Sequence, residues 1–297
     1  MPHEPKRHPT GRAVVPAMEA HLLVPVPCLD HGFVRLVDYM GDDSAIVEAA
    51  RVSFGGGTRA IRKDRDLVRY LLRNGHTSPF EMCEIKLHVK LPIFVARQWV
   101  RHRTASLNEL SGRYSVLDRD SYLPAPQDLA RQSTDNRQGR GEVLDPDDAA
   151  RVLDLLRHDA ETCHATYDHL LEQHDLAREL ARIGLPLSTY TQWTWKIDLH
   201  NLLHFLRLRL HPHAQQEIRV YATAIADLTR AWVPLTWEAF EDYVLHAVSL
   251  SRGGLEAVRR ALRGEPVDPS ALGLGRREWE ELHAAIPEVA SPGPARG

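Results

Sequence analysis

Hydrophobic and polar residues alternate along parts of this chain in a pattern typical of β-strands. From Cys83 to Leu91 every second side chain is apolar, which predicts a strand with one buried face. The run from Thr189 to Ile197 is rich in threonine and tryptophan and predicts a second extended segment. A shorter apolar run, Phe33 to Val37, predicts a third strand.

Apolar residues recur at helical spacing over a larger share of the chain. Asp64 to Asn74 is amphipathic and stops at Gly75, and Asp145-Pro146 opens a long helix that runs to about Gln173. Further helices are predicted over residues 44–50, 175–184, 199–210, 213–232 and 236–248. Together these elements predict an α+β fold, a helix-rich single domain around a small mixed or antiparallel sheet.

Composition divides the chain into three regions. Residues 1–21 are rich in proline, histidine and charge, and predict a disordered N-terminal tail. Residues 22–250 hold the periodic segments and form the main domain, with a surface loop over residues 125–148. Residues 251–297 predict short helices and then a flexible C-terminal tail.

Length, charge and cysteine content limit the class of protein. The 297 residues are 43% hydrophobic, enough for a sizeable core, and the net charge of -3 gives no overall field that attracts nucleic acid. The cysteines, Cys28, Cys83 and Cys163, form no C-x-x-C and favour a reducing compartment. The sequence shows neither an apolar run of membrane-spanning length nor a signal-peptide core. We therefore expect a cytoplasmic protein without membrane association.

The most polar stretch of the chain, Arg97 to Ser115, directly follows the apolar run Leu91 to Ala96. It carries four arginines, one histidine and several hydroxyl and amide groups. Pro92 suits the first turn of a helix that would bring the arginines to its C-terminal end. Thr104 to Tyr114 has no helical or alternating period and predicts a structured loop. Several guanidiniums directed at one place indicate an anion pocket, with phosphate as the first candidate.

Other chemistries lack their sequence signals. Neither G-x-x-x-x-G-K-[ST] nor G-x-G-x-x-G occurs, which excludes a phosphate-loop fold and a Rossmann fold. No serine lies in G-x-S-x-G, and Cys28 and Cys163 have no neighbouring cation or histidine to which a role is assigned, which argues against nucleophilic catalysis. His200, His204 and His213 resemble a metal-ligand spacing, but Pro212 interrupts them and we expect no metal site.

One motif within the arginine-rich stretch resembles a known family. Arg101-His102-Arg103, then seven residues, then Ser111, matches the R-H-R-x7-S signature of the flavin-dependent thymidylate synthases. The resemblance runs from about Gly32 to about Val248. It includes Ala50 to Phe54, His76 to Phe80, Ile93 to Trp99, Leu185-Pro186, Leu206 to Arg209 and His213 to Gln215.

The resemblance implies a reaction and its cofactors. A member of this family would convert dUMP to dTMP, with methylenetetrahydrofolate as the carbon donor and FAD, reduced by NADPH, as the hydride source. In this family reduced flavin takes the place of a cysteine nucleophile, and FAD is bound without a Rossmann domain. The resemblance also implies a homotetramer whose active sites are built from more than one subunit.

The resemblance also assigns roles to individual positions. Arg209 would be the catalytic residue, stabilising negative charge on the uracil ring. The positions that match dUMP-binding residues are Gln98, Val100, Arg101, Glu109, Ser111, Gly112, Arg113, Arg182 and Arg209. The positions that match FAD-binding residues are Ser53, Ser78, Glu81, Arg101, His102, Arg103, Glu109, Asp198, His200 and His204. His76 matches a histidine beside the flavin and the folate.

Helical spacing places some of these side chains apart. His200, His204 and Arg207 share one helix face, whereas Arg209 points away from His204. We therefore expect His204 and Arg209 to serve pockets on different sides of their helix, as a site shared between subunits would allow. On the preceding helix, Glu179 is placed to orient one of its neighbouring arginines.

Two alternatives from other classes remain. The arginine-rich loop could bind the phosphates of RNA or DNA, although the near-neutral net charge and the single basic cluster argue against it. A metal-dependent hydrolase built on His200, His204 and His213 is the third hypothesis. The absorbance spectrum of the purified protein would separate the three, because a flavoprotein is yellow.

Overall fold

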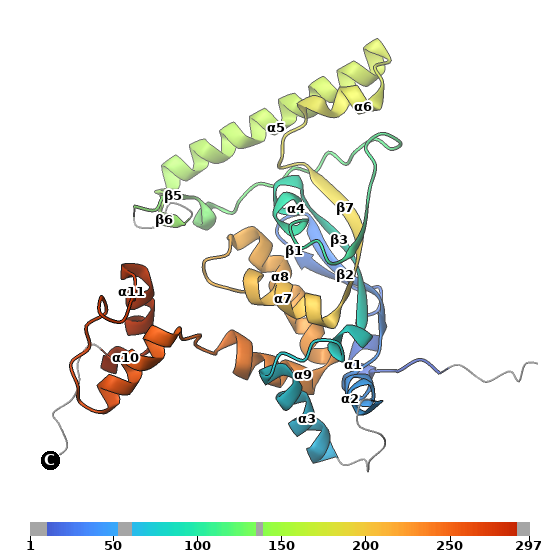
Figure 1. The fold of residues 1–297 in the computed structure, drawn as a ribbon. Helices are drawn as coiled ribbons and strands as arrows, with labels where there is room; N and C mark the ends of the chain where they lie inside the picture. Colours follow the sequence, from blue (N-terminus) through green and yellow to red (C-terminus); the bar gives the residue numbers. More distant parts are fainter. Residues whose placement is uncertain (1–10, 53–60, 135–138, 290–297) are drawn as a thin grey trace, which may run out of the picture. The chain divides into compact units, whose positions relative to one another are not determined.

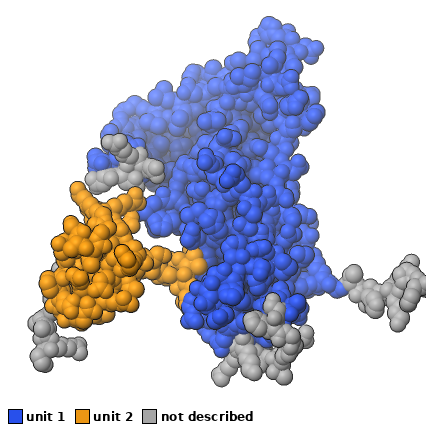
Figure 2. Space-filling model, in the orientation of Figure 1, with its two compact units in different colours: residues 1–240 blue, residues 241–297 orange. Residues whose placement is uncertain are grey.

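The computed structural model describes residues 11–52, 61–134 and 139–289. The chain divides into two compact units, residues 1–240 and residues 241–297, which Figure 2 shows in different colours. All the predicted site residues belong to the larger unit. One of them, Ser53, lies outside the described residues.

A five-stranded antiparallel sheet forms the centre of the larger unit (Figure 1). In spatial order its strands are β1 (Pro25–Cys28), β2 (Gly32–Met40), β3 (Glu84–Pro92), β7 (Tyr190–Asp198) and β4 (Ser106–Glu109). All neighbouring strands in it run antiparallel, whereas a Rossmann sheet is mostly parallel. The predicted α+β class with a small antiparallel sheet is therefore confirmed.

Strands β3 and β7 pair along their full length, from Glu84 opposite Asp198 to Pro92 opposite Tyr190. Their alternating apolar side chains are buried on one face of the sheet. Three helices contact strands of this sheet and also pack against one another. They are α4 (Ile93–Trp99), α7 (Leu199–Arg209) and α8 (Gln216–Trp232).

Trp99, the last residue of α4, is the centre of an aromatic cluster between these helices and β7. Its ring centroid lies 5.6 Å from that of Trp193, 5.1 Å from that of Trp195 and 4.8 Å from that of Phe205. All of these rings are buried. Each aromatic ring buries on the order of 150–250 Å², so the cluster holds the C-terminal end of α4 firmly against the sheet.

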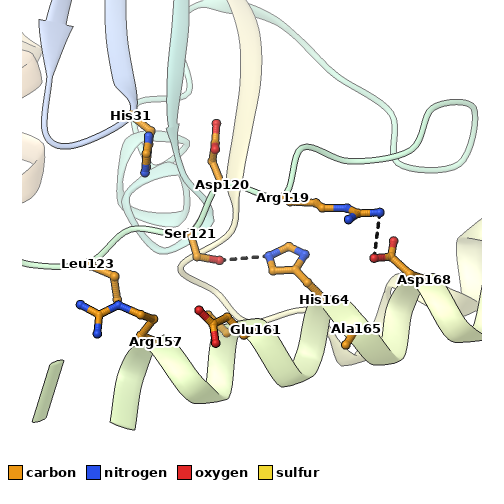
Figure 3. Close-up of a pocket in the computed structure, with 11 residues that line it drawn as sticks. His31, Arg119, Asp120, Ser121, Leu123, Arg157, Glu161, His164, Ala165 and Asp168 are labelled. Atoms are coloured by element: carbon orange, nitrogen blue, oxygen red, sulfur yellow. Dashed lines mark hydrogen bonds and ion pairs between the residues drawn. The ribbon is translucent and has the colours of Figure 1, made fainter. Parts of the chain in front are cut away.

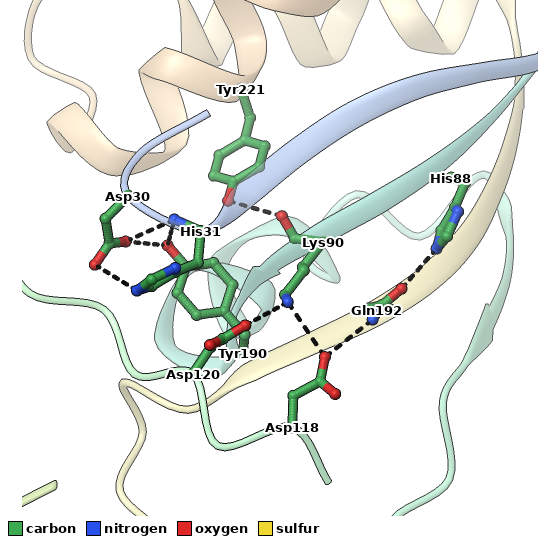
Figure 4. A network of polar contacts seen from close by, with 9 residues as sticks. All are labelled: Asp30, His31, His88, Lys90, Asp118, Asp120, Tyr190, Gln192 and Tyr221. Carbon is green, nitrogen blue, oxygen red and sulfur yellow. Dashed lines mark hydrogen bonds and ion pairs between the residues drawn. The ribbon is translucent and has the colours of Figure 1, made fainter. Parts of the chain in front are cut away.

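The opposite face of the sheet carries a network of polar contacts (Figure 4). His88 Nε2 lies 3.0 Å from Gln192 Oε1, and Gln192 Nε2 donates to Asp118 Oδ2 at 3.2 Å. Lys90 Nζ bridges Asp118 at 3.2 Å and Asp120 at 2.6 Å. These contacts join β3 and β7 to the segment that follows the arginine-rich loop, so this segment is tied to the sheet rather than free.

Other helices surround the sheet. Those of the larger unit include α2 (Asp43–Val52), α3 (Ile61–Arg73), the 3-10 helix η1 (Phe80–Met82), α5 (Pro146–His174), α6 (Arg178–Ala181), the 3-10 helix η3 (Arg182–Gly184) and α9 (Pro234–Phe240). The predicted caps are confirmed for the long helix, since the Asp145 side chain accepts from the Asp148 backbone at 2.9 Å. No helix in the part of the chain that the structure describes is long and apolar enough to span a membrane.

Within the predicted N-terminal tail, residues Pro16–Glu19 form a short helix, α1. Its Met18 side chain is fully buried, and α1 contacts α8. The Tyr39 hydroxyl accepts from the Val15 backbone N–H at 2.8 Å and donates to Glu19 at 2.5 Å. The expectation of disorder is therefore wrong for this segment, because one apolar anchor and one hydroxyl hold it against the sheet. Residues 1–10 lie outside the described range.

The predicted surface loop 125–148 also contains regular structure. It holds the 3-10 helix η2 (Pro126–Asp128) and an antiparallel pair, β5 (Ala130–Gln132) and β6 (Arg140–Val143). The Leu144 backbone N–H donates to the Leu129 carbonyl at 2.9 Å and closes the base of this β5–β6 hairpin. Its strands are largely exposed on both faces, so their sequence lacks the alternation that would have predicted them.

The smaller unit is helical. It comprises the short π-helix η4 (Glu241–Leu245), α10 (Arg252–Leu262), α11 (Arg276–Ala285) and the 3-10 helix η5 (Pro287–Val289). Ala257, Leu274, Leu282 and Val289 form its own buried cluster. Ser251 caps α10 by accepting from the Gly254 N–H at 3.1 Å.

Gly32, the first residue of β2, offers a test of the sheet packing. A Cβ at this position would lie 2.0 Å from the Tyr221 hydroxyl and 2.7 Å from the Cys28 carbonyl oxygen. We expect Gly32→Ala to lower the free energy of unfolding by roughly 2–3 kcal/mol through overpacking. Gly184→Ala is the control, since nothing lies within 4 Å of its added Cβ. Urea unfolding measures both, and equal midpoints would contradict the prediction.

Candidate active site

The arginine-rich stretch begins where α4 ends at Trp99. The Arg101 backbone N–H donates to the Gln98 carbonyl at 3.3 Å, and the His102 N–H donates to the Trp99 carbonyl at 2.9 Å. These bonds form a tight turn directly after the buried tryptophan. Strand β4 then pairs with β7, with Ser106 opposite Lys196. The prediction of a structured loop over residues 104–114 missed strand β4, whose exposed side chains leave no periodic signal.

This turn and α7 enclose a pocket of about 290 Å³. The residues that line it are Arg101, His102, Arg103, Thr104, Ile197, Asn201, His204, Leu208 and Arg209. Arg209 Nε donates to His102 Nε2 at 3.0 Å, and the His102 ring centroid lies 6.0 Å from that of His204. Residues that are more than a hundred positions apart in the sequence thus meet at one point.

The expectation that His204 and Arg209 face different pockets is wrong. Both line the same pocket, and His102 lies between them as partner of Arg209 and neighbour of His204. Within α7 alone, the five positions from His204 to Arg209 correspond to roughly 140° of rotation, which separates the two side chains. The His102 side chain, which comes from the turn after α4, lies between them and contacts both.

The charges in this pocket are arranged to keep His102 neutral. Burial, followed by the nearby charges of Arg209 and His204, lowers the pKa of His102 to about 4. Its Nε2 can therefore accept the Arg209 N–H at neutral pH. Burial also lowers the pKa of Arg209, although a guanidinium stays charged. Arg101 and Arg103 are exposed and form no ion pair with any residue in the described ranges, so their charge is available to an anion.

A second cluster of predicted residues lies around α6 and η3. Arg113 Nε donates to Glu179 Oε2 at 3.1 Å, and the Arg113 backbone N–H donates to Ser111 Oγ at 3.3 Å. A Cβ on the buried Gly112 would lie 3.3 Å from Arg182 Cδ, so Arg182 lies beside this loop. Glu179 thus holds an arginine of another segment, and not one of its own helix as the sequence predicts.

The two clusters occupy different places in one copy of the chain. Strand β4 lies between them, and a strand advances about 3.3 Å per residue, so its ends are roughly 10 Å apart. Arg101 and Arg209 line the first pocket, whereas Ser111, Gly112 and Arg113 follow the far end of the strand. The structure therefore brings together the residues within each cluster, but does not join the two clusters into one pocket.

Three predicted residues have specific partners nearby. Gln98 donates through Nε2 to Gln215 Oε1. Glu109 Oε1 accepts from the Thr191 hydroxyl at 2.7 Å. Asp198 is the N-cap of α7 and accepts from the Asn201 backbone at 2.9 Å, as predicted. The partners Gln215 and Thr191 were missed as functional neighbours, because they are far from Gln98 and Glu109 in sequence and no local pattern connects them.

The remaining predicted residues lie around the same region. Glu81 is exposed on η1, which contacts α7. Ser78 and His76 precede it and are also exposed, with the His76 ring centroid 5.8 Å from that of Tyr70. His200 is half-buried on α7, and Val100 is the C-cap of α4. Among the described residues, no group of three or more histidine, cysteine or acidic side chains could hold a metal ion.

A second pocket, of about 400 Å³, lies between α5 and the segment around Ser121 (Figure 3). Ser121 Oγ lies 3.1 Å from Nε2 of the buried His164. His164 Nδ1 has no partner among the described residues, so no carboxylate orients the ring as in a hydrolytic triad. Arg119 is paired with Asp168 at 2.9 Å. The pocket contains none of the predicted site residues.

Comparison with known proteins identifies the family of this chain. A family model described as thymidylate synthase complementing protein matches residues 35–235. The flavin-dependent thymidylate synthase of Gluconobacter oxydans is 59% identical over 279 residues, covering 93% of this chain and 92% of the relative. That of Ruegeria pomeroyi is 57% identical, covering 94% and 93%. The chain belongs to the flavin-dependent thymidylate synthase family.

Solved structures of a related enzyme share the fold of this family member. The UMP/dUMP methylase PolB of Streptomyces cacaoi, bound with 5-Br UMP, has a TM-score of 0.66 and 36% identity, covering 72% of this chain and 95% of that chain. With 5-Br dUMP bound, the TM-score is 0.68 at 34% identity, covering 74% and 99%. The resemblance identified from the R-H-R-x7-S signature is therefore confirmed.

The depressed pKa of His102 predicts a pH dependence of stability. In the unfolded chain an ordinary histidine takes up its proton near pH 6.5, whereas His102 in the folded state does so near pH 4. Between these values the unfolded state binds more protons, so the free energy of unfolding falls as pH falls. His102→Gln keeps an acceptor for Arg209 and removes this titration, so we expect a smaller loss of stability between pH 7 and pH 4.5.

Urea unfolding at several pH values measures the effect. His158→Gln, at an exposed position of α5, is the control and should follow the wild-type pH dependence. A wild-type slope in the His102→Gln variant would contradict the prediction.

Proposed function

We propose that this chain is a flavin-dependent thymidylate synthase that reductively methylates dUMP to dTMP. Methylenetetrahydrofolate is the carbon donor, and NADPH reduces the FAD that supplies hydride. The observation that carries the proposal is the pocket in which Arg209 is held by neutral His102, beside Arg101 and Arg103, which have no acidic partner among the described residues. The net charge of -3 and the family membership disfavour the nucleic-acid alternative.

The pocket fits the chemistry of a flavin dinucleotide. Arg101 and Arg103 offer to a diphosphate two guanidiniums that form no ion pair within the described part of the chain. A volume of about 290 Å³ suits part of such a cofactor rather than all of it. When bound, FAD supplies the redox chemistry that no side chain can. The residues we assign to FAD are Ser53, Ser78, Glu81, Arg101, His102, Arg103, Glu109, Asp198, His200 and His204, with His76 beside flavin and folate.

Arg209 is the residue we assign to substrate activation. His102 holds its Nε, which leaves the two terminal nitrogens of the guanidinium for a ligand. A fixed cation beside the uracil ring stabilises negative charge on it and so favours attack by the ring carbon. The other residues we assign to dUMP are Gln98, Val100, Arg101, Glu109, Ser111, Gly112, Arg113 and Arg182.

The cysteines are consistent with chemistry that uses no enzyme nucleophile. Burial raises the pKa of both Cys28 and Cys83 to about 12. At neutral pH both are protonated thiols, and neither lines the pocket of Arg209. Because a thiol is a poor nucleophile compared with a thiolate, neither residue is suited to attack a uracil ring.

We further propose a homotetramer in which each active site combines residues of different subunits. The separation of the Arg209 pocket from the Ser111–Arg113 cluster in one copy supports this assembly. Large apolar side chains around the second cluster are exposed, including Leu180 at 49%, Ile183 at 75% and Leu187 at 63%. An exposed apolar group of this kind suits burial against a second copy. The cytoplasmic location stays a prediction.

Replacing Arg209 tests the proposed reaction. The purified wild-type protein, supplied with FAD, should show flavin absorbance bands and form dTMP from dUMP. Arg209→Ala should abolish dTMP formation, a loss of about 10³-fold or more, because the uracil anion loses its stabilising charge. Flavin absorbance should largely remain.

Arg207→Ala is the matched control, since Arg207 is exposed on the same helix. A fully active Arg209→Ala enzyme would exclude the role of Arg209. A wild-type protein that binds no flavin and forms no dTMP would refute the function itself.

Mixing two inactive variants tests the shared site. Arg209→Ala damages the pocket beside α7, and Arg113→Ala damages the cluster beside α6. If each site combines the two clusters from different subunits, hybrid assemblies contain some sites with both halves intact. The two variants are either co-expressed or unfolded together and refolded as a mixture. With random pairing, about half of the pockets and half of the clusters are intact, so we expect about a quarter of wild-type activity. No recovery, together with a monomer in light scattering, would exclude the shared site.

A further inference from the structure

The start of α8 connects the β5–β6 hairpin to α4. Gln215, the N-cap residue, accepts a hydrogen bond from Gln98 of α4. The next residue, Gln216, accepts through Oε1 from Arg140 Nη1 at 2.8 Å and donates through Nε2 to Asp128 Oδ1 at 2.6 Å. Arg140 and Asp128 both belong to the segment expected to be a surface loop. This segment therefore contacts the helix turn that holds Gln98.

Glu217, the third residue of this turn, fixes the arrangement. Its side chain is only 4% exposed, and its Oε1 accepts from Arg140 Nη2 and, at 3.1 Å, from the Tyr122 hydroxyl. A buried carboxylate requires such partners, because it has lost its hydration. Its Oε2 already has no partner among the described residues. Without Arg140, the first turn of α8 would have to shift to return the carboxylate to water.

We propose that Arg140 is a positioning residue for dUMP. Through Glu217 it holds the first turn of α8, and this turn holds Gln215 against the Gln98 amide. The inference rests on the proposed function, in which Gln98 contacts dUMP. The bond to Gln215 uses one N–H of that amide and leaves the other N–H and Oε1 for the nucleotide. A side chain that is already ordered binds its ligand at a smaller entropic cost.

Substitution of Arg140 in the full-length, FAD-loaded enzyme tests this inference. Arg140→Ala should raise both the Kd and the KM for dUMP about tenfold, the effect of losing about one hydrogen bond. The kcat at saturating dUMP and the flavin absorbance should stay within about twofold, because Arg140 does not line the Arg209 pocket. Arg140→Lys should restore most of the affinity, since an ammonium can still pair with Glu217.

Arg131→Ala is the matched control. Arg131 lies on the other strand of the same hairpin, and its side chain, 61% exposed, pairs with Asp148 at 3.5 Å. We expect its dUMP affinity to equal that of the wild type. An equal loss of affinity in Arg131→Ala and Arg140→Ala would overturn the inference, since the hairpin as a whole would then be responsible.

A double-variant cycle tests the route through α8. Gln215→Ala should weaken dUMP binding to a similar extent, and adding Arg140→Ala should weaken it no further, because both changes release the same Gln98 amide. Additive effects, or an unchanged dUMP Kd in Gln215→Ala, would overturn the inference. If the wild-type enzyme neither binds dUMP nor forms dTMP, the proposed function fails as well. If the wild type binds dUMP and the variants bind it equally well, the inference is overturned but the proposed function stands.

Discussion

The packing of Trp99 is the constraint on which the rest of this structure depends. Its ring is enclosed by Trp193 and Trp195 of β7 and by Phe205 of α7. The turn with Arg101, His102 and Arg103 begins two residues later, so its position is set by the core rather than by the loop. The same α7 that covers Trp99 carries Arg209 at its end. The residues that pack the core therefore also fix the position of the site, which gives its charged side chains a rigid support.

The Arg209 pocket is positively charged because its arginines, unlike many others in the chain, form no ion pair with an acid among the described residues. Many arginines on this chain are matched by acids, such as Arg65 and Arg69 with Glu238. Arg101, Arg103 and Arg182 have no such partner among the described residues, and Arg209 has only a neutral imidazole. Grouped cations without acids repel one another and lower the stability of the empty protein. A bound dianionic nucleotide or a diphosphate would remove that repulsion, so ligand binding and stability are coupled.

The fold could be predicted wherever a pattern lies in one segment. The alternation of Cys83 to Leu91 matches β3 within one residue, because burial of one face dictates a period of two. Strand β4 and the β5–β6 hairpin have no buried face, so they depend on backbone pairing that the sequence does not display. For the site, the signature located the turn after α4. It could not show that His102 contacts Arg209 or that Glu179 contacts Arg113, since both contacts join distant segments.

Strand β4 places a further condition on the proposed assembly. It pairs with β7 from Ser106 opposite Lys196 to Glu109 opposite Trp193, so it is a rigid spacer between the Arg209 pocket and the Ser111–Arg113 cluster. If the Ser111–Arg113 cluster of one copy completes the Arg209 pocket of a second copy, a two-fold axis requires that the cluster of the second copy completes the pocket of the first. Each copy then serves two sites, and the length of β4 fixes the distance between them. In such an assembly, separation of the subunits would divide both sites at once, so the assembly would itself be part of the catalytic machinery.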